Sequence, residues 1–132
     1  MDPKLDPRLD PKRWPTEIRL AKDKRSLRVA FDDGSAFELA AEYLRVTSPS
    51  AEVQGHSPAE RKTVPGKRDV QIIGVEPVGN YAVQLVFSDG HDTGIYSFDL
   101  LYEYGSTQDR MWADYLQRLA QAGASREAPA GS

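Results

Sequence analysis

Apolar and polar residues alternate in two separate stretches of the chain, residues 26–39 and 83–96. In each stretch an apolar run ends in a phenylalanine and then an Asp-Gly pair, at Asp33-Gly34 and at Asp89-Gly90. Alternation with a period of two is typical of a half-buried strand, and Asp-Gly supplies the positive φ angles that a tight hairpin turn needs. Both stretches are therefore predicted to form β-hairpins.

The two hairpins align with each other 56 residues apart, the separation of Phe31 from Phe87. Three further apolar pairs keep this register: Leu27 with Val83, Val29 with Leu85, and Leu39 with Ile95. Each half is predicted to contain three strands and then a helical turn. The expected strands are 17–20, 26–31 and 35–39 before a turn at 40–45, and 70–75, 81–87 and 93–96 before a turn at 98–104 that Gly105 ends. Short connections imply antiparallel pairing.

The clearest helix is predicted near the C-terminal end, with Ser106 or Thr107 as its cap and Gly123 as its stop. An apolar stripe on this helix is expected to pack against the chain's own sheet. The stripe consists of Met111, Trp112, Tyr115, Leu116 and Leu119.

The segment between the halves, residues 45–68, is longer than most connections inside a compact domain. Ser48-Pro49 and Ser57-Pro58 each place a capping hydroxyl before a proline, which predicts single helical turns. Arg61, Lys62, Lys67 and Arg68 make this segment basic; a solvated loop and a phosphate site are both open readings.

The fold class predicted from these elements is α+β: an antiparallel, β-rich domain of two similar hairpin halves, with short helices and a C-terminal amphipathic helix. Residues 1–14 carry a threefold Asp-Pro repeat and are expected to be a disordered arm. Residues 15–122 are expected to form a single domain, and residues 123–132 a disordered tail.

Charge and composition narrow the classes of function. The 132 residues include 20 acidic and 17 basic side chains in a mixed order, so no global field attracts nucleic acid or anionic lipid. Cysteine is absent, which removes disulfides, thiolate nucleophiles and thiolate metal sites. No apolar run has the length of a signal peptide or a membrane span. We expect a cytoplasmic protein without nucleic-acid or membrane partners, as a monomer or a weak homo-oligomer.

Few residues are candidates for chemistry. His56 and His91 are the only histidines, and the sequence gives no independent sign that they converge on an iron site. The one compact polar cluster is Asp89, His91 and Asp92, beside the second predicted turn. A structural turn and a ligand site both fit this cluster.

A set of short motifs resembles the gamma-butyrobetaine hydroxylase-like N-terminal domain family. The motifs are Tyr43-Leu-Arg-Val, Ser48-Pro-Ser-Ala-Glu-Val, Val64-Pro-Gly-Lys, Glu76-Pro-Val-Gly, Asp89-Gly-His-Asp and Gly94-Ile-Tyr, and the resemblance covers roughly residues 15–119. In this family the domain precedes the oxygenase domain of 2-oxoglutarate-dependent hydroxylases or follows the P-loop ATPase of certain iron–sulfur cluster carriers. The resemblance therefore implies an accessory role, without the catalytic domain of the hydroxylases.

The resemblance also implies where a structural zinc site would lie. The family's hydroxylases bind zinc through a Cys-Pro-Cys-type segment, a third cysteine, and a histidine beside the second turn. Here Ser48 and Ser50 stand at the first two thiolate positions, Val53 lies near the third, and only His91 matches a ligand. Because neutral hydroxyls do not replace thiolates for zinc, no metal and no cofactor are expected.

We expect from these features a non-catalytic binding or adaptor module, accessory to an iron–sulfur cluster carrier ATPase or a 2-oxoglutarate oxygenase. Two alternatives remain open: a small-molecule or metal-ion binding protein that uses His91 and nearby carboxylates, and a structural homo-oligomer joined through a strand edge. The expected partner or ligand surface combines the segment after the first half with the second turn. Its residues are Ser48, Ser50, Glu52, His56, Asp89, His91 and Asp92.

Overall fold

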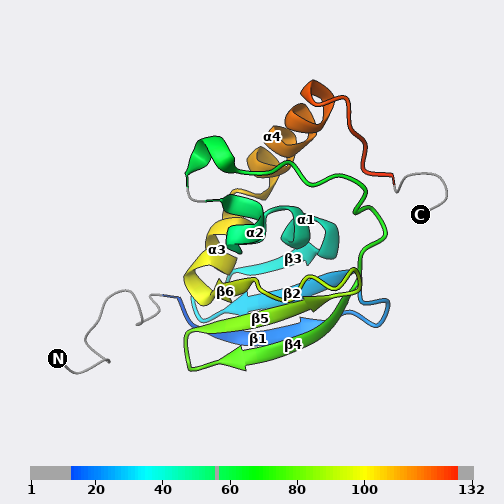
Figure 1. Cartoon of the computed structure of the whole chain (residues 1–132). Coiled ribbons are helices and arrows are strands. Elements are labelled where there is room, and N and C mark those ends of the chain that lie inside the picture. The colour runs from blue at the N-terminus through cyan, green and yellow to red at the C-terminus, as the bar shows by residue number, and fades with distance from the viewer. Residues whose placement is uncertain (1–12, 56, 128–132) are drawn as a thin grey trace.

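The computed structural model describes residues 13–55 and 57–127, and within them the strands form two antiparallel three-stranded sheets (Figure 1). The first sheet has the order β1-β2-β3 and the second the order β4-β5-β6. The strands are β1 Pro15–Leu20, β2 Ser26–Phe31, β3 Ala36–Ala40, β4 Ile72–Val78, β5 Ala82–Phe87 and β6 Ile95–Ser97.

Each sheet is followed directly by a helix, and two short helical segments lie in the connection between the halves. The helices are α1 Ala41–Val46, α2 Ala51–Gln54, the 3-10 helix η2 Pro58–Glu60, α3 Phe98–Ser106 and α4 Gln108–Gln121. The α+β prediction is confirmed, together with the plan of three strands and a helix in each half. In the part of the chain that is described, no helix is both long and apolar enough to cross a membrane.

Both Asp-Gly turns close antiparallel hairpins, as predicted, and they do so with the same backbone hydrogen bonds. Phe31 N–H donates to the carbonyl of Ser35, and Phe87 N–H donates to that of His91. Gly34 and Gly90 adopt φ angles of +89° and +92°, in the region that favours glycine over other residues. The local pattern of aspartate and glycine is therefore sufficient to place both turns.

The predicted alignment of the two halves is wrong at the third strand. Leu39 is fully buried and pairs with Leu27, but Ile95, its predicted counterpart, is 46% exposed. Tyr96 takes the buried place instead and pairs with Val83. Because neighbouring residues of a strand point to opposite faces, this shift of one residue exchanges the inner and outer side chains of β6.

The main hydrophobic core is built from both halves. It contains inward-facing residues of both sheets together with residues of α1 and α3. Its fully buried members include Leu27, Val29, Leu85, Phe87 and Tyr96. Burying each such side chain stabilises the fold by roughly 2 kcal/mol. Because the core takes residues from both sheets, neither sheet has a complete core without the other.

The predicted packing of the C-terminal helix against the sheet is only partly correct, because α4 lies mainly against helices and the central connection. Tyr115 and Leu119 form a separate small cluster with Val46 of α1, and Val64 of the connection packs against it. Leu116, which was expected in the apolar stripe, is 40% exposed. Gly123 has a φ of +64° just beyond the helix, in agreement with its predicted role as the stop.

Gly105 was predicted to end a helical turn, but α3 continues through Ser106 and Gly105 has no positive φ. The reason for a glycine here is a close approach, because a Cβ at this position would overlap the ring of Phe37 on β3. Gly105 therefore permits α3 to lie directly against the first sheet.

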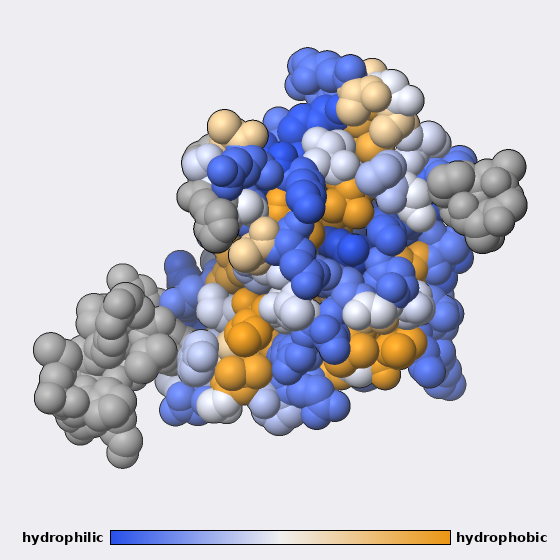
Figure 2. Space-filling view, viewed as in Figure 1, coloured by the Kyte–Doolittle hydropathy of each residue, from blue (hydrophilic) through white to orange (hydrophobic). Residues whose placement is uncertain are grey.

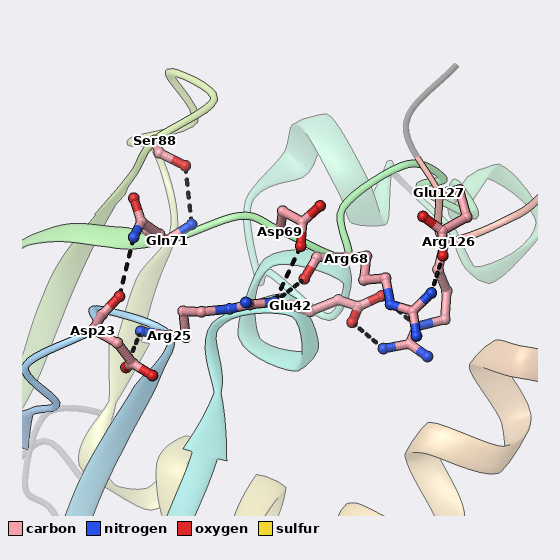
Figure 3. A network of polar contacts seen from close by, with 9 residues as sticks. All are labelled: Asp23, Arg25, Glu42, Arg68, Asp69, Gln71, Ser88, Arg126 and Glu127. Carbon is pink, nitrogen blue, oxygen red and sulfur yellow. Dashed lines mark hydrogen bonds and ion pairs between the residues drawn. The ribbon is translucent and has the colours of Figure 1, made fainter. Parts of the chain in front are cut away.

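Residues 123–127 belong to the tail that was expected to be disordered, and they return across the central connection (Figure 3). Gly66 N–H and Arg68 N–H donate to the carbonyls of Ser125 and Arg126. The Arg126 guanidinium then reaches Glu42 at the start of α1. We call residues 124–127 the C-terminal strap. Residues 1–12 and 128–132, the rest of the predicted arm and tail, lie outside the described residues.

Candidate functional site

The segment after the first half is held beside the second hairpin turn. Helix α2 begins after Ser50, whose side chain accepts a hydrogen bond from Glu52 N–H. The predicted cap at Ser48 is therefore wrong by two residues, and Ser48 points to the turn instead. A single helical turn at Ser57-Pro58 is confirmed by η2.

His91 is the centre of the contact between the two segments. Its Nε2 lies 2.9 Å from the Ser48 hydroxyl, and its Nδ1 lies 3.1 Å from a carboxylate oxygen of Glu52. Next to them, the hydroxyls of Ser50 and Thr93 are 2.7 Å apart. We call these five residues, Ser48, Ser50, Glu52, His91 and Thr93, the polar clasp. It joins residues 48–52 of the central connection to residues 91–93 of the second half.

Hydrogen bonds fix the roles of the atoms in the polar clasp. A carboxylate can only accept, so His91 donates its Nδ1–H to Glu52, and in the neutral imidazole the Nε2 then accepts from the Ser48 hydroxyl. The Ser48 oxygen in turn accepts the Ser50 backbone N–H at 3.2 Å. Burial and the Arg45 guanidinium lower the pKa of His91, although the Glu52 and Asp89 carboxylates counteract part of this. His91 is therefore neutral at pH 7, as this arrangement requires.

Asp89 lies beside the polar clasp in a strongly basic environment. Its Oδ2 is 2.8 Å from Arg45 Nε and 2.7 Å from Lys67 Nζ, and its Oδ1 accepts the His91 backbone N–H. Burial raises the pKa of Asp89, but the hydrogen bonds from Lys67, the His91 backbone and Arg45 outweigh this and lower it to about 2. Asp89 thus stays ionised and ties the turn to α1 and to the central connection.

The order of groups in the polar clasp resembles that of a nucleophile, a base and an orienting acid. Access is missing, however, because Ser48 is fully buried and His91 is only 7% exposed. A Cβ on Gly94 would lie 2.6 Å from the Ser48 oxygen, so the space in front of the hydroxyl is already filled by backbone. An acyl group cannot approach Ser48, and the geometry supports a structural network instead of acyl transfer.

The predicted surface residues therefore separate into two groups. Ser48, Ser50 and His91 are buried, whereas the carboxylates of Glu52 and Asp92 face solvent. Among the described residues, Asp92 contributes its backbone carbonyl, which accepts from Gln84 at 2.5 Å. His56 lies outside the described residues.

Sequence reasoning missed four residues that complete this region: Arg45, Lys67, Thr93 and Gly94. Thr93 and Gly94 directly follow the predicted cluster, and Gly94 belongs to a quoted motif, so their proximity could have been inferred. Arg45 and Lys67 also lie in quoted motifs, but those motifs do not show that the two side chains pair with Asp89. Their pairing with Asp89 joins residues 44 and 22 positions apart, and no local pattern encodes it.

The residues present do not fit the zinc that the family resemblance implies. His91 Nε2 is occupied by a serine hydroxyl, and the other two matching positions provide a second hydroxyl and the apolar, 2% exposed Val53. Zinc in structural sites takes four good donors, mostly thiolate and imidazole. In residues 13–55 and 57–127, no three His, Cys, Asp or Glu side chains are grouped in a way that could hold a metal ion.

Comparisons with known proteins identify a family and several solved structures that are similar to this chain. A search of curated proteins gave no match. Two solution structures determined by NMR are similar. One is 46% identical, with a TM-score of 0.77, and the match covers 89% of this chain and 92% of that chain. The other is 47% identical, with a TM-score of 0.76, and the match covers 97% of this chain and 92% of that chain.

A crystal structure from Acidithiobacillus ferrooxidans, of a protein of unknown function in the DUF971 family, is 42% identical over 66% of this chain and 86% of its own, with a TM-score of 0.55. The family model described as "Gamma-butyrobetaine hydroxylase-like, N-terminal" matches residues 18–102, which include the polar clasp, the whole second sheet and the first sheet from Ile18 of β1 onward. The chain therefore belongs to the gamma-butyrobetaine hydroxylase-like N-terminal family.

Proposed function

We propose that this chain is a non-catalytic protein-binding module that presents the surface around the polar clasp to a partner. The observation that supports this proposal is that the buried residues of the polar clasp lie beside two exposed carboxylates. We call these two residues, Glu52 and Asp92, the rim. Ser48 and His91 hold two segments from different halves in one geometry, while Glu52, at the start of α2, and Asp92 extend from those segments into solvent. Loops on a rigid scaffold are common sites of recognition.

The charge of the rim indicates the chemistry of the partner. One carboxylate oxygen of Glu52 accepts from His91, but the side chain is 63% accessible, and Asp92 makes no hydrogen bond or ion pair through its side chain to the described residues. Two carboxylates on neighbouring segments favour a partner with lysine or arginine side chains. An iron–sulfur cluster carrier ATPase is the partner class that we favour, and a 2-oxoglutarate oxygenase is the second, since the family resemblance implies both contexts.

Binding to a purified cluster carrier ATPase from the same organism tests the proposal, with affinity measured by biolayer interferometry. Reversing both rim charges, Glu52→Lys with Asp92→Lys, is expected to weaken binding at least about tenfold. The matched control is Glu76→Lys with Glu103→Lys, which makes the same change in net charge at two exposed positions away from the rim. The control is expected to bind like the unmodified chain.

Stability must be measured in parallel, because Glu52 also contacts His91. Asp92→Lys alone leaves the polar clasp intact and is expected to weaken binding without changing the melting temperature. Equal binding by the rim variant and its control would refute the proposed surface. Metal retained at one equivalent by the purified protein would support the metal-binding alternative, and concentration-dependent self-association in sedimentation, without partner binding, would support the homo-oligomer.

A further inference from the structure

A hollow lined by described residues lies between α4 and the segment that joins α1 to α2. Its volume is about 520 Å³, which falls in the range of small-molecule sites. Val46, Tyr104 and Met111 provide an apolar floor. Figure 2 shows hydrophobic surface framed by hydrophilic side chains at the junction of α4 with α1 and α2. This hollow, the α4 groove, does not include His91 or the exposed carboxylates of the rim.

Positive charge dominates the edge of the α4 groove. Three arginines line it, Arg61, Arg110 and Arg118, against a single carboxylate, Asp114. Asp114 is already engaged, because its Oδ2 lies 3.0 Å from Arg118 Nε and 3.9 Å from an Arg61 nitrogen. One carboxylate therefore balances one of three guanidinium groups, and the groove keeps an excess of positive charge.

Arg110 is the arginine of the groove whose hydrogen-bond donors are not used by the described residues. It stands one helical turn before Asp114 on α4 and is exposed, and its guanidinium forms no hydrogen bond or ion pair with the described residues. Arg118, by contrast, already donates to Asp114 and to the Thr63 hydroxyl at 3.2 Å. A guanidinium presents a planar fork of donors that matches carboxylate, sulfonate or phosphate oxygens in pairs.

We propose that the α4 groove is a binding site for a small amphipathic anion, a molecule with one acidic group and an apolar aliphatic or aromatic body. The acidic group pairs with Arg110 at the edge, and the apolar body covers Val46, Tyr104 and Met111. The Gln54 side chain, which donates to the Ser48 carbonyl and also lines the groove, is placed to accept from a polar substituent. This site is independent of the proposed partner surface.

The probe for the test is 8-anilinonaphthalene-1-sulfonate, which has a fused aromatic body and one sulfonate, and its uncharged counterpart is N-phenyl-1-naphthylamine. Fluorescence titration is expected to give saturable binding of the sulfonate at one molecule per chain. The amide resonances that shift in NMR spectra are expected to belong to residues 46–49, 54, 104 and 110–118. Binding of the uncharged compound is expected to be weaker.

Arg110→Gln is expected to weaken binding of the sulfonate about tenfold, because one charge-assisted pair is lost. The matched control, Arg19→Gln, removes the same charge from an exposed position on β1 and is expected to bind like the unmodified chain. Asp114→Asn, which removes the one carboxylate among the described lining residues, is expected to tighten binding. Equal effects of Arg110→Gln and Arg19→Gln, resonance shifts confined to the sheets, or equal affinity for the uncharged compound would each overturn the proposal.

Discussion

Arg126 holds Glu42 across 84 residues of sequence with two parallel hydrogen bonds, of 2.6 and 2.8 Å. Glu42 lies at the start of α1 with a side chain that is only 6% exposed, while the Arg126 guanidinium also lies 5.2 Å from the centre of the Trp112 ring. A carboxylate this deeply buried requires a cation, since an unpaired charge in such a position is costly. The C-terminal strap therefore supplies the counter-charge for a position in the first half.

Arg126→Ala is expected to lower the free energy of unfolding by about 2 kcal/mol. This is less than for a fully buried pair, because the Arg126 side chain is 34% exposed and water can reach the carboxylate once it is removed. Chemical denaturation measures the change. Arg68→Ala is the control, since its pair with Glu127 is half exposed on both sides and is worth less than about 1 kcal/mol. Equal losses in both variants would contradict the special role of Glu42.

Stability should depend on pH through His91. The pKa of His91 is lowered in the folded state from an ordinary value of 6.5, so the unfolded chain binds this proton more readily. The stabilisation is complete above about pH 7 and is lost as the pH falls through 6.5 toward the folded-state pKa. Urea denaturation at a series of pH values should show this decline in the unmodified chain and in His56→Asn. A decline of the same size in His91→Asn would show that another group is responsible.

A second, more acidic decline is expected from Asp89. Its pKa of about 2, against an ordinary 3.8, corresponds to about 2 kcal/mol of stability that is present above pH 4 and lost as the pH approaches 2. Asp89→Asn should remove this decline and lower the stability at pH 7, because Arg45 and Lys67 lose their counter-charge. Retention of the full acid transition in Asp89→Asn would contradict the assignment.

Gly105→Ala is expected to destabilise the protein by about 2–3 kcal/mol, because the added Cβ would force the Phe37 ring from its place between α3 and β3. Gly90→Ala is the comparison. A Cβ there meets no atom within 4 Å, so only the strain of a φ of +92° remains, about 1 kcal/mol. Thermal unfolding of both variants measures the difference. Partial recovery of Gly105→Ala by an added Phe37→Leu would show that the ring is the obstacle.

The zinc site implied by the family should be absent here but recoverable. Elemental analysis of protein purified without chelators is expected to find no stoichiometric zinc, because serine and valine stand at the thiolate positions. The triple variant Ser48→Cys, Ser50→Cys and Val53→Cys should bind one zinc ion with His91 as the fourth ligand. Adding His91→Ala should weaken that binding strongly. Zinc at one equivalent in the unmodified chain would contradict this expectation.

Local sequence patterns predict the two hairpins well because the determinants of each hairpin are local. Phe31 and Phe87 precede Asp-Gly pairs whose backbone geometry depends on no distant contact. The register of the last strand could not be read in this way. Ile95 and Tyr96 are adjacent and both apolar, so alternation does not decide which one faces the core, and the longer turn before them resolves the ambiguity only in three dimensions.

The candidate site shows the same limit. Turn chemistry singled out Asp89 and His91, and the family resemblance placed Ser48 near them, which the hydrogen bond between Ser48 and His91 bears out. The burial of Ser48 was not foreseen, because it depends on backbone packing at Gly94 that no local pattern encodes. The α4 groove was missed for the same reason, since its lining comes from four separate parts of the chain.

The shared core makes this protein a candidate for fragment reassembly. A cut between Glu60 and Arg61, in an exposed stretch, would leave one three-stranded sheet on each piece. Each piece would then expose the apolar face that the other piece covers in the intact protein. Neither piece should fold alone, but the two should associate when mixed, so that folding becomes a bimolecular reaction whose midpoint shifts with concentration. The chain would then behave as an obligate heterodimer of two β-β-β-α pieces.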